Sequence, residues 1–348
     1  MNILTFWTMS ASFLLQMLSG RFRPHDRSES LLRTPEGSIR IDVYEPTERP
    51  QGVILTVNGL APLGNRDPRF ERVNRAMAGC GFRVISPFMD DLCSYKIGVQ
   101  NIRQVRAFIE AVQKDRTLAP RGRVSIFAPS FAGSLSMIAA ADPAVSSGVD
   151  AICALGSFAS APAVIEKLFV EHDVDEYGRL ILLLNYLHLS IGQNAEVEQA
   201  LRLAIEDSYF HYREPMLPDY LELMEPSNRI VFESLRKSVA ARNFHWKIIE
   251  RRGQQKGQSV EDLSLLRDSV PGGLKAAVSL IHGKQDSVVP SSESRKLYEY
   301  LKKAGKKVRL TITPLLSHGD QKSPVWNLHH LPGLIAGFGF FFRHARQV

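Results

Sequence analysis

Short, largely apolar runs recur along the chain and constrain its fold more than any other feature. They occur at residues 52–59, 82–88, 123–129, 151–158, 276–283 and 308–316. Such runs are typical of strands buried on both faces of a sheet. Segments with helical spacing of apolar residues, such as 99–114, lie between them. We therefore expect the α/β class, with a mostly parallel sheet covered by helices on both faces.

The alternation of strands and helices is interrupted between residues 161 and 273, where the sequence predicts helices and shows no strong strand signal. This block lies between two predicted strands, so its simplest interpretation is a helical cap inserted into an α/β core. The predicted organisation is an N-terminal amphipathic helical segment (residues 1–30), a core (31–160 and 274–348) and the cap (161–273).

Ser130 stands at a predicted strand-to-helix turn. It follows the run at 123–129 directly and precedes a helix rich in small residues. Ala128 lies two residues before Ser130 and Ala132 two residues after it, and Gly133 follows. Because these residues are small, a sharp turn here would cause few side-chain clashes. This pattern is typical of a nucleophilic serine, although it is weak evidence by itself.

A serine hydroxyl needs a base, and the base needs an acid that fixes its tautomer. His318 follows the predicted strand at 308–316, and Asp286 follows the one that ends at Gly283. Parallel strands end at one edge of a sheet, so Ser130, Asp286 and His318 are the candidate catalytic triad.

Other residues compete for these roles. His282 precedes the end of its strand, and we expect it to support the loop rather than to act as the base. Asp90 and Asp91 follow the run at 82–88, which is the wrong strand for the usual acid. Histidines within the predicted cap are more often surface or core residues than ligands.

With these motifs in the order serine, acid, histidine, the chain resembles the α/β-hydrolase superfamily over residues 38–158 and 274–348. The resemblance implies that the backbone N–H groups of Leu60 and Phe131 form the oxyanion hole. Asn58 and Gly59 would support the loop that carries Leu60. The sequence departs from the family where Asn58 replaces a histidine and where alanines replace the glycines around the serine.

The resemblance implies a serine hydrolase that cleaves a carboxylic ester or thioester, and the large predicted cap favours a medium or long acyl chain. Three alternatives stay open: an acyltransferase that uses the same triad, a non-catalytic relative that binds a ligand or partner, and a membrane-attached interaction protein. The sequence has no glycine-rich phosphate loop, no cluster of Cys and His and no HExxH motif, so we expect no metal and no cofactor.

Charge gives weaker indications about partners. A net charge of +7 on 348 residues is too small to predict a nucleic-acid-binding protein. Residues 236–258 contain seven Lys or Arg and one acid, which indicates a solvated helix face or a patch for anionic groups. Three scattered cysteines do not form a disulfide framework, so we expect a reducing, cytoplasmic environment.

Residues 2–20 carry no charge and have roughly amphipathic helical spacing, and Arg21, Arg23 and Arg27 follow. An uncharged amphipathic helix with a basic flank suits a membrane interface. The alternative is a helix that packs only on the protein's own surface. The sequence therefore leaves peripheral membrane association through residues 1–27 as an open prediction.

Overall fold

The computed structural model describes residues 3–255, 260–267, 269–317 and 328–347. Contacts divide the chain into two units, which we describe separately. Unit 1 comprises residues 1–94, 99–159 and 263–348, and unit 2 comprises residues 95–98 and 160–262. Unit 2 corresponds broadly to the block expected to form a cap, and its action as a cap stays a prediction.

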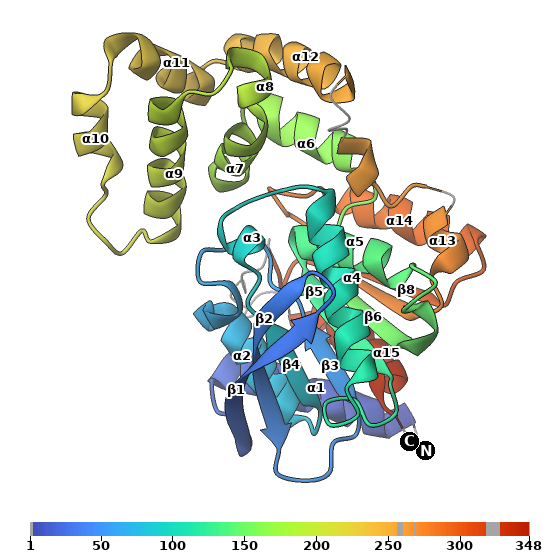
Figure 1. Cartoon of the computed structure of the whole chain (residues 1–348). Coiled ribbons are helices and arrows are strands. Elements are labelled where there is room, and N and C mark those ends of the chain that lie inside the picture. The colour runs from blue at the N-terminus through green and yellow to red at the C-terminus, as the bar shows by residue number, and fades with distance from the viewer. Residues whose placement is uncertain (1–2, 256–259, 268, 318–327, 348) are drawn as a thin grey trace. The chain divides into compact units, whose positions relative to one another are not determined.

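Unit 1 is built on one eight-stranded sheet with the order β1-β2-β4-β3-β5-β6-β7-β8 (Figure 1). All pairs from β4 to β8 are parallel, whereas β1 and β2 are antiparallel to their neighbours. The predicted α/β class with a mostly parallel sheet is therefore confirmed. The strands are β1 (His25–Thr34), β2 (Gly37–Pro46), β3 (Val53–Thr56), β4 (Arg83–Pro87), β5 (Val124–Pro129), β6 (Val149–Leu155), β7 (Ala277–Gly283) and β8 (Val308–Thr313).

Strand β1 was not expected from the sequence. Its residues, HDRSESLLRT, are mostly polar, and nearly all of them are exposed because β1 lies at the edge of the sheet. The strand is held by its antiparallel register with β2, in which His25 pairs with Pro46 and Thr34 with Gly37. Residues 25–30, grouped above with the N-terminal helical segment, therefore belong to this strand.

Helices pack on this sheet within unit 1. Helices α1, α2 and α15 share one apolar core with sheet residues such as Ile54, Phe127 and Cys153. Helix α5 packs on β5 and β6, and α14 packs on β7 and β8. The helices are α1 (Ile3–Ser19), α2 (Pro68–Gly79), α3 (Asp90–Cys93), α4 (Val99–Lys114), α5 (Ser130–Ala140), α13 (Ser269–Gly273), α14 (Ser291–Lys303) and α15 (Leu331–Ala345), with 3-10 turns η1 (Gly64–Arg66), η2 (Ser146–Gly148) and η5 (Leu328–His330).

The regular secondary structure of the described residues of unit 2 is helical, as the sequence pattern predicts. Two buried arginines hold its helix ends together, because their guanidinium groups donate to backbone carbonyls that helix termini leave unpaired. Arg179 Nε donates to Leu168 O, and Arg242 Nη1 donates to Leu235 O. The helices are α6 (Ala161–Val170), α7 (Glu176–Tyr186), α8 (His188–Ile191), α9 (Ala195–Tyr209), α10 (Leu217–Leu223), α11 (Pro226–Lys237) and α12 (Val239–Gln255), followed by the 3-10 turn η3 (Val260–Leu263).

Candidate active site

Ser130 occupies the strained turn that joins β5 to α5. Its φ of 55° lies in the left-handed region, where a residue with a Cβ atom is disfavoured. Such backbone strain costs about 1–3 kcal/mol and is concentrated at functional sites. The turn places Ser130 at the carboxyl end of a central strand and at the first residue of a helix.

The small residues around Ser130 have a steric cause. Ala128 and Ala132 are fully buried. A Cβ atom on Gly133 would lie 2.8 Å from the carbonyl oxygen of Ala128 and would collide with the Ser157 hydroxyl. The helix can therefore begin this close to the strand only because position 133 has no side chain.

The loop predicted to carry the oxyanion hole reaches the serine. A Cβ atom on Gly59 would lie 3.9 Å from the Cβ atom of Ser130, which is ordinary van der Waals distance. Asn58 is buried, and its side-chain nitrogen donates to the Gly59 carbonyl at 2.8 Å. Asn58 thus stabilises the loop from within.

The two predicted oxyanion donors lie on these neighbouring segments. Phe131 is the second residue of α5, and the first N–H groups of a helix have no partner within the helix. Leu60 directly follows Gly59 and is partly exposed. The convergence of their two N–H groups on one oxygen atom stays a prediction.

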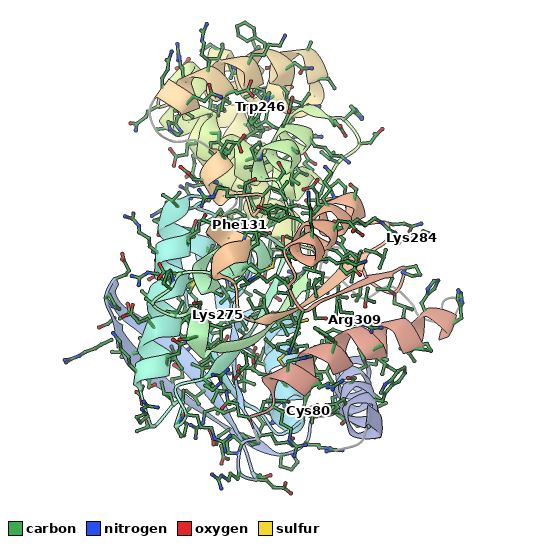
Figure 2. All side chains as sticks on the ribbon, turned by 90° about the vertical axis from the view of Figure 1, so that its right-hand side faces the viewer. Cys80, Phe131, Trp246, Lys275, Lys284 and Arg309 are labelled. Carbon is green, nitrogen blue, oxygen red and sulfur yellow. The ribbon has the colours of Figure 1, made fainter. Side chains whose placement is uncertain are left out.

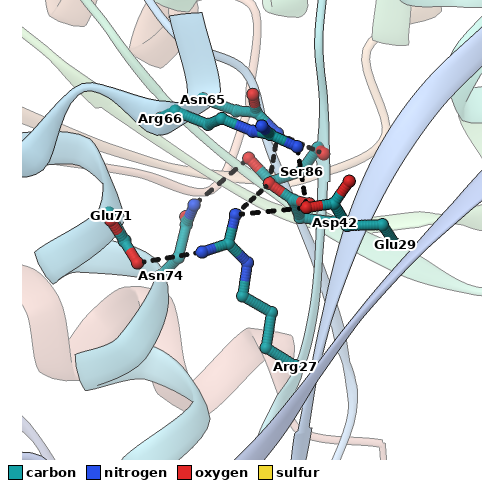
Figure 3. Close-up of polar contacts among 8 residues, drawn as sticks. All are labelled: Arg27, Glu29, Asp42, Asn65, Arg66, Glu71, Asn74 and Ser86. Carbon is teal, nitrogen blue, oxygen red and sulfur yellow. Dashed lines mark hydrogen bonds and ion pairs between the residues drawn. The ribbon is translucent and has the colours of Figure 1, made fainter. Parts of the chain in front are cut away.

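A polar cluster anchors the same loop a few residues further on (Figure 3). The side-chain nitrogen of Asn65, in η1, donates to Asp42 Oδ2 at 2.9 Å and to Ser86 O at 3.0 Å. Arg27 Nη2 donates to the same Asp42 oxygen at 3.1 Å. Burial raises the pKa of Asp42 despite the nearby positive charge of Arg27. The loop is consequently fixed at both ends, by Asn58 and by Asn65.

Asp286 lies in the loop after β7 with its side chain fully buried. Its Oδ1 atom accepts from the backbone N–H groups of Val288 and Val289, at 2.9 and 2.8 Å. These bonds hold the carboxylate in one orientation. They involve Oδ1 only, so the other oxygen atom, Oδ2, takes no part in them. A buried carboxylate with a fixed orientation is what the acid of a triad requires.

His282, the competing histidine, is buried and engaged on both ring nitrogens. Nδ1 lies 2.6 Å from Ser294 Oγ, and Nε2 lies 2.8 Å from Val289 O and 3.4 Å from Asp286 Oδ2. An imidazole enclosed in this way has no face for a substrate. Its position matches the supporting role expected from the sequence.

Two serines that the sequence analysis did not identify as site residues extend this support toward the nucleophile. Ser294 Oγ donates to the Ser157 carbonyl at 3.1 Å, and Ser157 Oγ donates to the Ser130 carbonyl at 3.5 Å. Both side chains are fully buried. Ser157 stands at the end of a predicted strand, but only the pairing of β6 with β5 shows that it reaches Ser130.

His318 lies outside the described residues, so the histidine of the predicted triad is not described. The residues just before it are described. A Cβ atom on Gly283 would lie 2.5 Å from Leu316 O and 3.2 Å from Ser317 O, so the segment after β8 runs against the start of the Asp286 loop. Leu316 and Ser317 therefore lie beside the start of that loop.

The competing carboxylates are placed elsewhere. Asp90 and Asp91 begin α3 after β4, and β4 is separated from β5 by β3. Asp91 accepts a hydrogen bond from Gln104 at 2.7 Å. Within the described ranges, no group of three or more His, Cys, Asp or Glu residues is arranged to hold a metal ion.

Comparisons with known proteins identify the fold. No protein-family model matches the sequence, and no curated protein sequence is significantly similar to it. Among solved structures, the acylaminoacyl peptidase of Pyrococcus horikoshii has a TM-score of 0.53 at 16% identity, over 95% of this chain and 44% of the peptidase. This chain therefore spans less than half the length of that enzyme.

Two other neighbours are similar along nearly their whole length. The dienelactone hydrolase of Anabaena variabilis has a TM-score of 0.51 at 13% identity, over 93% of this chain and 100% of that one. A thermostable esterase of Pseudomonas putida has a TM-score of 0.52 at 12% identity, over 97% and 90%. Together with the sheet order, these likenesses show that the chain has the α/β-hydrolase fold.

Proposed function

We propose that this protein is a serine hydrolase that cleaves carboxylic esters or thioesters through Ser130. The observation that carries the proposal is the left-handed backbone of Ser130 at a turn between a central strand and a helix. A non-glycine residue holds this conformation only where the surrounding structure enforces it. The strained turn lifts a nucleophile out of the sheet edge, as in the nucleophile elbow of this fold.

In the proposed mechanism, Ser130 Oγ forms a bond to the acyl carbonyl carbon while His318 takes the hydroxyl proton. Asp286 orients His318 and stabilises the imidazolium. The carbonyl oxygen becomes an oxyanion and accepts hydrogen bonds from the Leu60 and Phe131 N–H groups. The bond to the alcohol or thiol then breaks, and His318 returns the proton to the leaving group.

Water completes the cycle. His318 removes a proton from water while the water oxygen forms a bond to the acyl carbon. The bond between that carbon and Ser130 Oγ then breaks, His318 returns the proton to Oγ, and the acid is released. Each step transfers one proton and conserves electrons, so no cofactor is required. An alcohol or amine in place of water would give acyl transfer with the same groups.

A fluorophosphonate probe tests the nucleophile directly. We expect rapid covalent labelling of the wild-type protein and complete loss of labelling in Ser130→Ala. Ser287→Ala, an exposed serine in the Asp286 loop, is the matched control and should label at the wild-type rate. Labelling of Ser130→Ala at the wild-type rate would place the nucleophile elsewhere.

The acyl group is the less constrained part of the proposal. We infer a medium or long acyl chain, because unit 2 inserts a large helical block between β6 and β7. The apolar run of α7 adds no support, since Leu180, Ile181 and Leu183 are buried and α7 packs on α6 and α9 of the same unit.

The preference for an acyl chain length can be measured as the hydrolysis rates of p-nitrophenyl esters with acyl chains of increasing length. A peptide anilide is assayed in parallel to measure peptidase activity. Faster cleavage of acetate or of the anilide would contradict the inference.

A further inference from the structure

Helix α1 carries large apolar side chains on its outer side. Trp7, Leu15 and Leu18 are 42%, 66% and 51% exposed, and Ala11 is exposed between them. Positions 7, 11, 15 and 18 follow one another at helical spacing, so they form one continuous stripe, here called the outer stripe. The helix contains no charged residue along its 17 residues.

The inner side of α1 carries two polar side chains, Ser10 and Gln16, among apolar ones such as Met9, Phe13 and Met17 that pack on the core of unit 1. Ser10 and Gln16 are buried beside Phe13, whose ring lies 4.8 Å from that of Phe338 in α15. The same core contains Cys80, which is labelled in Figure 2. Both polar side chains are satisfied, since Ser10 Oγ donates to Phe6 O and Gln16 Oε1 accepts from Arg23 N. The residues of the outer stripe do not belong to this core cluster and leave a large part of their apolar surface exposed.

Four arginines surround the end of this helix. Arg21 and Arg23 follow it in sequence and are exposed. From α2, Arg72 donates to the Met17 carbonyl and Arg75 lies 4.4 Å above the ring of Phe22. Within the described part of the chain, no ion pair joins these four arginines to a carboxylate.

The nearby acids do not neutralise this cluster. Glu71, on the same helix as Arg72, is held by Arg27 at 3.1 Å. Asp26 is the first acidic residue after α1 and is exposed on β1. An excess of positive charge thus borders an exposed apolar surface at the end of α1.

We propose that the outer stripe and these four arginines bind the surface of an anionic lipid bilayer, with α1 lying in the plane of the interface. Apolar side chains of such a helix enter the boundary between headgroups and acyl chains, while guanidinium groups pair with phosphates. No helix in the described residues is long and apolar enough to cross a membrane. The charge complementarity selects anionic lipid over a second copy of the chain, whose identical arginines would repel.

Vesicle sedimentation tests the proposal with the full-length protein. We expect the protein to sediment with vesicles of phosphatidylcholine and phosphatidylglycerol and to bind phosphatidylcholine alone more weakly. The double variant Leu15→Glu/Leu18→Glu should bind both kinds of vesicle at least tenfold more weakly. Leu223→Glu, 84% exposed on α10, is the matched control and should bind like the wild type.

A second variant separates charge from apolar insertion. Each basic residue near an anionic membrane strengthens binding about fivefold. Arg21→Gln/Arg23→Gln should therefore weaken binding to the anionic vesicles by about 25-fold and leave binding to phosphatidylcholine unchanged. Raised salt should have the same effect as this variant.

Three results would overturn the inference. One is a wild-type protein that stays in the supernatant with anionic vesicles. Another is an equal loss of binding in Leu223→Glu. The third is a dimer in sedimentation equilibrium that Leu15→Glu/Leu18→Glu dissociates, which would make the outer stripe an interface between copies. Hydrolysis of a soluble ester by Leu15→Glu/Leu18→Glu is expected at the wild-type rate, so failure of this inference is distinct from failure of the proposed function.

Discussion

The Nε2 atom of His282 lies 3.4 Å from Oδ2 of Asp286, and both side chains are completely buried. Through Ser294 and Ser157 the same imidazole is connected to the backbone of Ser130. His282 therefore acts on the site through other residues, as a positioning residue. It holds the Asp286 loop against the segment that carries the nucleophile.

Replacing His282 tests this role. His282→Ala leaves buried partners unsatisfied, which costs about 1–3 kcal/mol of unfolding free energy. We also expect kcat for ester hydrolysis to fall at least tenfold with little change in KM, because substrate does not touch the ring. Urea denaturation and steady-state kinetics measure the two effects.

A conservative variant and a surface control complete that test. His282→Gln keeps a nitrogen donor and should recover part of kcat. His172→Ala, at an exposed histidine of unit 2, should change neither quantity. Equal kcat in His282→Ala and the wild type would show that the imidazole does not position the acid.

The strain at Ser130 predicts that glycine is more stabilising than alanine at this position, which is the reverse of their order inside a helix. At φ 55° glycine is favoured, so Ser130→Gly should be about 1 kcal/mol more stable than Ser130→Ala, although neither hydrolyses esters. At Ser136, inside α5, alanine should be the more stable by a similar amount. Thermal or urea unfolding of the four variants checks the prediction, and an alanine preference at position 130 would show that the turn is unstrained.

Gly133→Ala should destabilise the protein by about 1–3 kcal/mol, because the new methyl group meets the Ala128 carbonyl, which is backbone and cannot rotate away. Gly333→Ala serves as its control, since nothing lies within 4 Å of a Cβ atom at that helical position. The control should be neutral or slightly stabilising. Equal midpoints of urea unfolding for the two variants would contradict the proposed close approach of α5 to β5.

The three cysteines are free thiols. Burial raises the pKa of Cys80 and Cys93 to about 12 and raises that of Cys153 as well. At about pH 8 all three are therefore protonated, and only the thiolate is reactive. We expect Ellman's reagent to react slowly with the native protein at this pH, faster as pH rises, and immediately with all three thiols in denaturant. A rapid native reaction with Cys80 or Cys153 would contradict their burial.

The sequence by itself determined the class of fold and the candidate nucleophile. Short, largely apolar runs predict buried parallel strands, and small residues around Ser130 predict a sharp turn. These are local signals, because each depends on residues that are neighbours in the chain. Strand β1 lacked such a signal, since an exposed edge strand is held by its pairing with β2 rather than by burial.

Only the tertiary structure decided which parts of the chain meet. The path from Ser294 through Ser157 to Ser130 depends on the order of β5, β6 and β7 in the sheet. The sequence of α1 showed amphipathic spacing, but only the structure shows that Ser10 and Gln16 are buried with internal partners, while Trp7, Leu15 and Leu18 are exposed. A local pattern fixes the shape of a segment, whereas its partners follow from the packing of segments far apart in the chain.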